Sequence, residues 1–145
     1  HPAWLDHSVD YDVAYKANYI RVITMEHFIV TMLAKSGEEA KVASYYQRIG
    51  KDIEAAEGFL GRTVMCSVPG SMAEDVNKRI TAEQRAEHPP HDDEQSAQFI
   101  IHERWESKEA RWAFSSNLNI DRKAELFPYI LSAHTHEYYV DALNP

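Results

Sequence analysis

One segment restricts the fold of this chain more than any other: residues 99–114, FIIHERWESKEARWAF. We interpret residues 97–105 as a strand and residues 108–116 as a helix. Ser107 stands between them at the position of a helix N-cap. A strand that passes through a short polar turn into a capped helix predicts an α+β domain.

Three further strands are predicted, and a helix follows the first of them. Residues 27–34 (HFIVTMLA) are β-branched and apolar, as buried strands are. We interpret residues 59–68 and 134–140 as the second and the last strand. Ser36 with Glu39 forms a capping box that opens a helix after the first strand. Apolar residues recur in that helix at helical spacing, namely Val42, Tyr46, Ile49, Ile53 and Ala56.

Residues 69–95 are interpreted as a surface insertion between the second and third strands. Ser71 with Glu74, and Thr81 with Gln84, have the spacing of capping boxes and predict one or two polar helices. A pair of prolines then ends the helical pattern.

The order β-α-β-(insertion)-β-α-β is the split βαβ, or ferredoxin-like, arrangement. It predicts one antiparallel sheet of four strands with helices on one face. The other face needs a cover if it is apolar, and a second copy of the chain is the simplest one. Residues 27–145 form this domain in our interpretation. Residues 1–26, rich in aromatic side chains, are predicted to be an N-terminal arm that lies on the domain or on a partner subunit.

Composition narrows the class of protein. The chain has 145 residues, the size of one domain. Cys66 is the single cysteine, so an intrachain disulfide is excluded and a reduced cytoplasm is expected. We predict a buried, inert thiol for it. The net charge of −8, with scattered basic residues, argues against nucleic acid and anionic membrane surfaces as partners. No apolar run approaches the roughly 20 residues that cross a bilayer.

Three short segments carry a resemblance to a known family. Residues 102–110 (HERWESKEA) resemble the antibiotic biosynthesis monooxygenase family, in which a strand ends Glu-x-aromatic before a charged turn and a helix. Residues 56–61 and 126–131 resemble the segments that lead into two other strands of that family. The resemblance covers about residues 27–141 without the insertion. It implies a ferredoxin-like α+β sandwich that dimerises through its sheet into an α+β barrel.

The resemblance also implies an activity. It favours a cofactor-independent monooxygenase acting on electron-rich aromatic compounds, such as polyketide- or lignin-type phenols. In such a reaction a base removes a proton, the carbanion passes an electron to dioxygen, and an apolar pocket excludes water. Residues 112–115 lack the histidine of the haem-degrading branch, so we predict no cofactor. Two alternatives stay open: a cofactor-free lyase, isomerase or cyclase on a similar substrate, and a non-catalytic ligand-binding or assembly module.

Three histidines are the candidate catalytic bases. His134 and His136 form a His-x-His pair whose side chains share one face of a strand, together with Tyr138. We expect His27, at the start of the first strand, to lie near this row. Imidazole titrates in the range that proton transfer needs. A metal site would require a third ligand, and we predict no metal.

Aromatic residues are the candidate walls of the substrate pocket. Trp105 either lines the pocket or belongs to the core. Glu103 shares its strand face, and such a glutamate more often pairs with an arginine than acts as a base. His102 points to the opposite face, where we expect it to form hydrogen bonds at a subunit interface. The predicted substrate-binding residues are Trp105, Trp112, Tyr46 and Tyr138.

Overall fold

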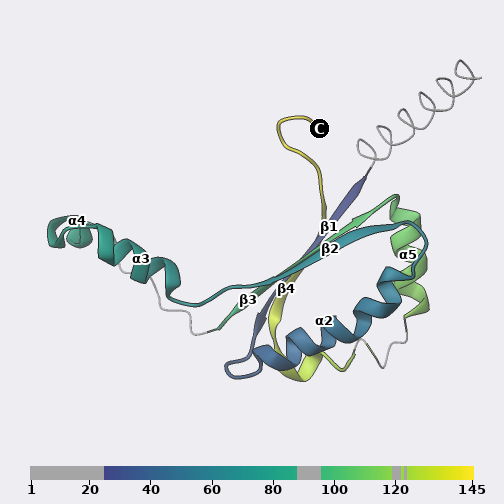
Figure 1. The fold of residues 1–145 in the computed structure, drawn as a ribbon, viewed down its shortest axis with the longest axis horizontal. Coiled ribbons are helices and arrows are strands. Elements are labelled where there is room, and N and C mark those ends of the chain that lie inside the picture. Colours follow the sequence, from purple (N-terminus) through teal and green to yellow (C-terminus); the bar gives the residue numbers. More distant parts are fainter. Residues whose placement is uncertain (1–24, 88–95, 119–121, 123) are drawn as a thin grey trace, which may run out of the picture.

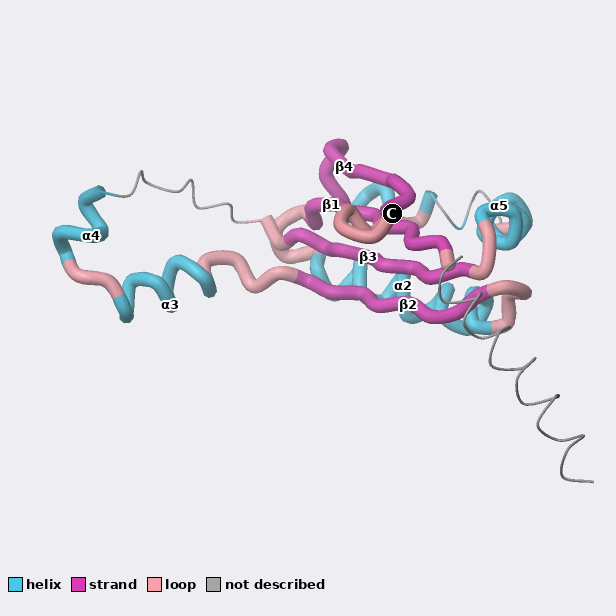
Figure 2. Tube along the Cα trace, turned by 90° about the horizontal axis from the view of Figure 1, so that it is seen from above, coloured by secondary structure: helices cyan, strands magenta, loops and turns pink. Residues whose placement is uncertain are grey.

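The computed structural model describes residues 25–87, 96–118, 122 and 124–145. Its strands form one antiparallel sheet in the order β2-β3-β1-β4, with β1 and β3 in the centre (Figure 2). The predicted element order and the ferredoxin-like fold are confirmed. The last strand begins earlier than the sequence predicts. The strands are β1 (Glu26–Ala34), β2 (Phe59–Cys66), β3 (Gln98–Trp105) and β4 (Ile130–Tyr139).

Two helices cover one face of this sheet. Helices α2 (Glu39–Glu54) and α5 (Lys108–Asn117) lie on the same side of the strands (Figure 1). A short 3-10 helix, η1 (Phe127–Tyr129), precedes β4. We call the side under α2 and α5 the covered face, and the side on which no described helix packs the open face.

Two of the predicted helix caps are present. The Ala110 amide donates to the Ser107 hydroxyl at 3.1 Å, which fixes the start of α5. Thr81 and Gln84 form a reciprocal capping box at the start of α4 (Ala82–Glu87). The Gln84 amide donates to the Thr81 hydroxyl at 3.2 Å, and the Thr81 amide donates to the Gln84 side chain at 2.9 Å.

Two other predicted caps are wrong. Helix α2 begins at Glu39 after the N-cap residue Glu38, and no side chain caps it, so Ser36 lies outside the helix. Ser71 is the first residue of α3 (Ser71–Arg79) rather than its cap. Gly70 takes the N-cap position with φ of 80°, a left-handed conformation that glycine adopts without steric cost.

Helices α3 and α4 project beyond the ends of β2 and β3, away from the sheet (Figures 1 and 2). None of their residues is buried, and Met72 is 73% exposed. The base of this projection is closed by the Ser67 amide, which donates to the Gln98 carbonyl at 2.8 Å. The Gln98 amide in turn donates to the Ser67 hydroxyl at 2.7 Å. Residues 88–95 of the predicted insertion, and residues 1–24 of the predicted arm, lie outside the described residues.

The register of the sheet decides which side chains meet. Because strand side chains alternate between faces, every second residue of β1 points to the covered face. There the β1 side chains are buried and join the hydrophobic core. Three rows cross the covered face from β3 through β1 to β4: Glu103–Phe28–Tyr138, Ile101–Val30–His136 and Phe99–Met32–His134.

The predicted burial of Cys66 is wrong. Its thiol is exposed, because it is the last residue of the edge strand β2, where the sheet leads into the projecting helices.

Candidate active site

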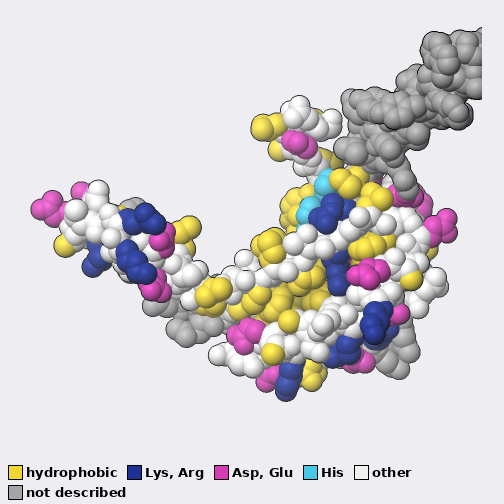
Figure 3. Space-filling model, viewed as in Figure 1, with side chains coloured by type: hydrophobic (Ala, Val, Ile, Leu, Met, Phe, Trp, Pro, Cys, Tyr) yellow, Lys and Arg dark blue, Asp and Glu magenta, His cyan; other side chains and the backbone are white. Residues whose placement is uncertain are grey.

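An inner cavity of about 330 Å³ lies between the covered face and helices α2 and α5. Figure 3 shows hydrophobic side chains along the hollow between the sheet and α2. Phe28, Val30, Met32 and Ile49 form part of an apolar wall. Such a cavity with a few convergent polar groups is the usual form of a small-molecule site. The ionisable residues that line it are Tyr45, Tyr46, Glu103, Arg111, His134 and His136.

Glu103 is held in place by Trp105. The indole Nε1 donates to the Glu103 carboxylate at 2.8 Å, across the two-residue spacing that places both on one face. Trp105 is completely buried, and its ring packs against Phe59 and Phe114 with centroids 5.4 and 5.7 Å away. Trp105 therefore belongs to the core behind Glu103 and does not line the inner cavity, contrary to its prediction as a substrate-binding residue.

Arg111 reaches the cavity from α5, four residues after the Ser107 cap. Its guanidinium carbon lies 3.4 Å from the centroid of the Phe28 ring, a cation–π arrangement. Its Nε lies 3.6 Å from a Glu103 carboxylate oxygen, and both side chains are largely buried. Burial raises the pKa of Glu103, although Trp105, Arg111 and Arg62 act in the opposite direction.

Tyr46 lines the inner cavity from α2, as the sequence predicts for a pocket residue. Its hydroxyl lies 3.8 Å from the Met32 sulfur. Burial is the main cause that raises its pKa, and the neighbouring Tyr45 and Glu103 add to the rise. The phenol is therefore neutral and available as a hydrogen-bond donor.

His136 and His134 stand at the exposed rim of the cavity on β4. The His136 ring centroid is 6.2 Å from that of Phe28 and 4.9 Å from that of His134. Burial, then His134, then Arg111 lower the pKa of His136. His136 is consequently a neutral imidazole at neutral pH, which can accept a proton. His134 Nδ1 donates to the Ser132 carbonyl at 3.0 Å, which fixes the orientation of the ring.

His27 does not join this row, contrary to expectation. It lies on the open face, because its register partners are Arg104 and Tyr139 rather than residues of the covered face. Its Nδ1 lies 2.8 Å from His102 Nε2. Arg104 Nη1 donates to His102 Nδ1 at 3.4 Å, so His102 donates through Nε2 to His27. Burial, then Arg104, then His27 lower the pKa of His102.

The two remaining predicted pocket residues lie outside the cavity. Tyr138 is on the covered face, where its ring centroid is 5.4 Å from Phe28 and the Lys108 amine lies 5.2 Å above it. Trp112 is 70% exposed on α5 and lines no part of the inner cavity. Sequence reasoning missed Arg111, which lies one helical turn after Ser107.

No group of three or more His, Cys, Asp or Glu residues in the described part of the chain could hold a metal ion. Within the same residues, no helix combines the length and the apolar character that crossing a bilayer requires.

Comparison with known proteins supports the fold. By sequence, no family model and no curated protein matches the chain. By structure, a point variant of SnoaB, a cofactor-independent oxygenase from Streptomyces nogalater, superposes with a TM-score of 0.54 at 10% identity, over 82% of this chain and 94% of that one. A Nitrosomonas europaea protein with a provisional assignment as an antibiotic biosynthesis monooxygenase gives 0.56 at 9% identity, over 82% and 91%.

A third similar structure is a Bacteroides thetaiotaomicron protein of unknown function with a suggested oxidoreductase assignment. It gives a TM-score of 0.51 at 12% identity, over 81% of this chain and 97% of that one. At such low identity these likenesses establish the fold and leave the chemistry to the site. The ferredoxin-like α+β fold that the sequence resemblance implies is thus confirmed.

Proposed function

We propose that this chain is a cofactor-independent monooxygenase that acts on electron-rich aromatic compounds of the polyketide- or lignin-phenol type. The observation that carries the proposal is the pairing of a neutral imidazole, His136, with a guanidinium, Arg111, at one apolar cavity. A base and a cation at the same cavity are what deprotonation of a weak carbon or oxygen acid needs. The fold shared with a cofactor-independent oxygenase supports the same activity.

The first step is proton removal. His136 accepts a proton from an activated C–H or O–H group of the bound aromatic, and the developing anion is stabilised by Arg111. Glu103 holds Arg111 in position through their contact of 3.6 Å. The apolar wall around Phe28 and Val30 strengthens this electrostatic stabilisation, because it excludes water.

The second step is transfer of an electron from the carbanion to dioxygen. Collapse of the resulting radical pair forms a C–O bond and gives a peroxide. Loss of water from the peroxide converts the original CH₂ group into C=O. One dioxygen is consumed, one of its atoms enters the product, the other leaves as water, and no external reductant is needed.

The test is oxygen uptake by protein treated with a chelator, measured against a panel of anthrone-type substrates, whose activated carbon is a CH₂ group. We expect one dioxygen consumed per carbonyl formed. His136→Gln should lower kcat/KM by about 10²–10⁴-fold, the usual contribution of a general base. His27→Gln is the control on the other face and should leave kcat/KM within about twofold, since His27 does not line the inner cavity.

Three outcomes would contradict the proposal. Turnover that proceeds unchanged without oxygen indicates a lyase, isomerase or cyclase. Absence of turnover with every substrate, while ligands bind, indicates a binding module. Full activity in His136→Gln removes this residue as the base.

We also propose that the chain forms a homodimer through the open face. Ile29, Leu33 and Ile100 lie there half-buried, and Met65 is 51% exposed. A second copy would remove these side chains from water. Sedimentation equilibrium tests this: Ile29→Arg should give monomers, whereas Trp112→Arg, on the outer side of α5, should leave the dimer intact. A monomeric parent protein would contradict the proposal.

A further inference from the structure

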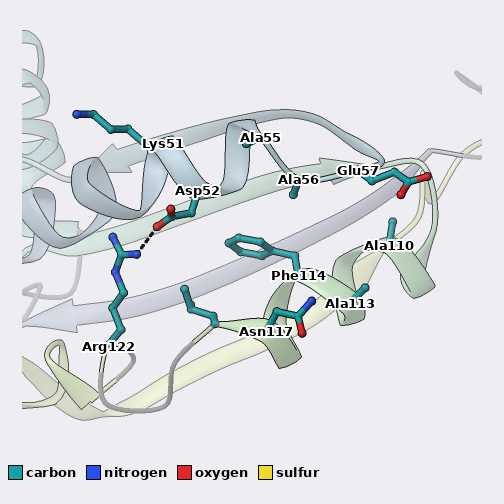
Figure 4. Close-up of a pocket in the computed structure, with 11 residues that line it drawn as sticks. Lys51, Asp52, Ala55, Ala56, Glu57, Ala110, Ala113, Phe114, Asn117 and Arg122 are labelled. Carbon is teal, nitrogen blue, oxygen red and sulfur yellow. Dashed lines mark hydrogen bonds and ion pairs between the residues drawn. The ribbon is translucent and has the colours of Figure 1, made fainter.

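A second space, which we call the outer cleft, separates the C-terminal half of α2 from α5. Its volume is about 590 Å³. Its facing walls carry short side chains: Ala55 and Ala56 on the α2 side, and Ala110 and Ala113 on the α5 side. Figure 4 shows these residues on opposite sides of the gap, with Phe114 directed into it. The alanines leave an apolar slot between the two helices.

The outer cleft and the inner cavity share a wall. Phe114 and Leu118 line both spaces. Phe114 is half-buried and packs on Trp105 with ring centroids 5.7 Å apart, so the core supports one side of its ring. A molecule in the inner cavity is therefore separated from the outer cleft by side chains rather than by backbone.

The polar groups of the outer cleft are balanced in charge. Lys51 and Arg122 stand against Asp52 and Glu57. Arg122 is already occupied, because it forms an ion pair with Asp52 (Figure 4) and donates to a backbone carbonyl of α2 at 3.2 Å. Asn117 adds a carboxamide that can both donate and accept a hydrogen bond. This surface suits an uncharged group better than an anion or a cation.

Size indicates how the two spaces would be used. A dry cavity of about 150 Å³ is enough to bind benzene, so the inner cavity of about 330 Å³ has room for an aromatic core. Any substituent extending from that core toward α5 meets Phe114 and then the outer cleft.

We propose that the outer cleft is an extension site for the distal part of the same substrate, and that Phe114 is the residue that determines how long a substrate can be. The occupant is a flat, apolar substituent that ends in an uncharged hydroxyl, ether or carbonyl group. This inference rests on the proposed function for the identity of the aromatic core, but its test needs binding only.

The experiment fills the outer cleft and leaves the inner cavity untouched. Ala113 is exposed on α5 and lines only the outer cleft, so Ala113→Trp adds bulk there without disturbing the core. The matched control is Glu109→Trp, at an exposed position of the same helix that lines neither space. The probes are 2-naphthol and 6-benzyloxy-2-naphthol, titrated into the full chain by calorimetry.

We expect Ala113→Trp to raise the Kd of the benzyloxy probe about tenfold or more and to leave that of 2-naphthol within twofold. Glu109→Trp should change neither. Phe114→Leu, which shortens a side chain between the two spaces, should lower the Kd of the benzyloxy probe several-fold relative to that of 2-naphthol. Each variant is first checked for cooperative thermal unfolding.

An equal rise in the Kd of both probes in Ala113→Trp would overturn the inference. An unchanged Kd of the longer probe in that variant would also overturn it, as would no binding of that probe to the parent protein. Selective weakening of the longer probe, in a protein that consumes no oxygen, would retain the extension site and contradict the monooxygenase alone.

Discussion

Each face of the same four-stranded sheet carries a pair of histidines, and the two pairs differ in what surrounds them. His134 and His136 on the covered face border a cavity that also contains Arg111. His27 and His102 on the open face contact each other at 2.8 Å, with no described helix over them. Burial is the largest cause of the lowered pKa in both His102 and His136. Residue type and direction of titration therefore do not distinguish the two pairs, whereas the face of the sheet on which each pair lies does.

The difference between the covered face and the open face can be tested first by substitutions on β3. Ile101 and Ile100 are neighbours on β3 that point to opposite faces; Ile101 is completely buried and Ile100 is not. Ile101→Ala should lower the free energy of unfolding by about 2–5 kcal/mol, the usual cost of a large-to-small change in a packed core. Ile100→Ala should cost less than about 1.5 kcal/mol, since much less apolar area is lost there. Urea unfolding monitored by tryptophan fluorescence measures both.

Unfolding at low protein concentration keeps association out of that measurement. If both variants lose the same stability when monomeric, the two faces are equally packed and the distinction between them is wrong.

A second test uses Glu103 on the covered face. Burial raises its pKa, so the folded chain retains the proton to higher pH than the unfolded chain does. The stability that this adds is present at low pH and is lost as pH rises above about 4.3 and through the folded-state pKa. Glu103→Gln preserves an acceptor for the Trp105 indole and should flatten this decline in a series of thermal unfolding curves. An unchanged slope in Glu103→Gln would show that the carboxyl is more hydrated than the structure indicates.

The smallest expected effect belongs to His102 on the open face. Its pKa is lowered in the folded chain by burial, by Arg104 and by His27. The stability that this lowered pKa contributes is fully present above about pH 6.5, and it is lost as pH falls through the folded-state pKa. His102→Gln should reduce this acid-side loss slightly, because the side chain is only partly buried. Unfolding in urea at several pH values measures it; an acid-side loss identical to that of the parent would contradict the contacts that we describe on the open face.

Local signals in the sequence predict a large part of the fold. The period of two places Glu103 and Trp105 on one face, and the structure joins them by a hydrogen bond. Ser107 and the Thr81–Gln84 box cap helices as their spacing indicates. These signals act over a few residues, because side chains at a fixed spacing form hydrogen bonds with the backbone amides at the start of a helix. Ser36 fails as a cap because the chain turns at Gly37, with φ of 82°, before the helix begins.

The composition of the site depends on register, which the sequence alone does not determine. A shift of one residue between β1 and β4 moves every side chain of a strand to the other face. The expectation that His27 lies beside His134 fails for this reason, because the observed pairing of His27 with Tyr139 places it on the open face. Arg111 escapes sequence reasoning because its role depends on how α5 packs over Phe28, a contact between residues far apart in the chain.

The closed base of the projecting helices has a consequence for how this chain can vary. Ser67 and Gln98 complete the ladder between β2 and β3 before the chain leaves the sheet, so the intervening segment is topologically one hairpin loop. Each doubling of the length of a flexible loop costs only about 0.6 kcal/mol of closure entropy. We therefore expect that the length and sequence of this segment can change, by natural divergence or by design, while the register that builds the cavity stays fixed.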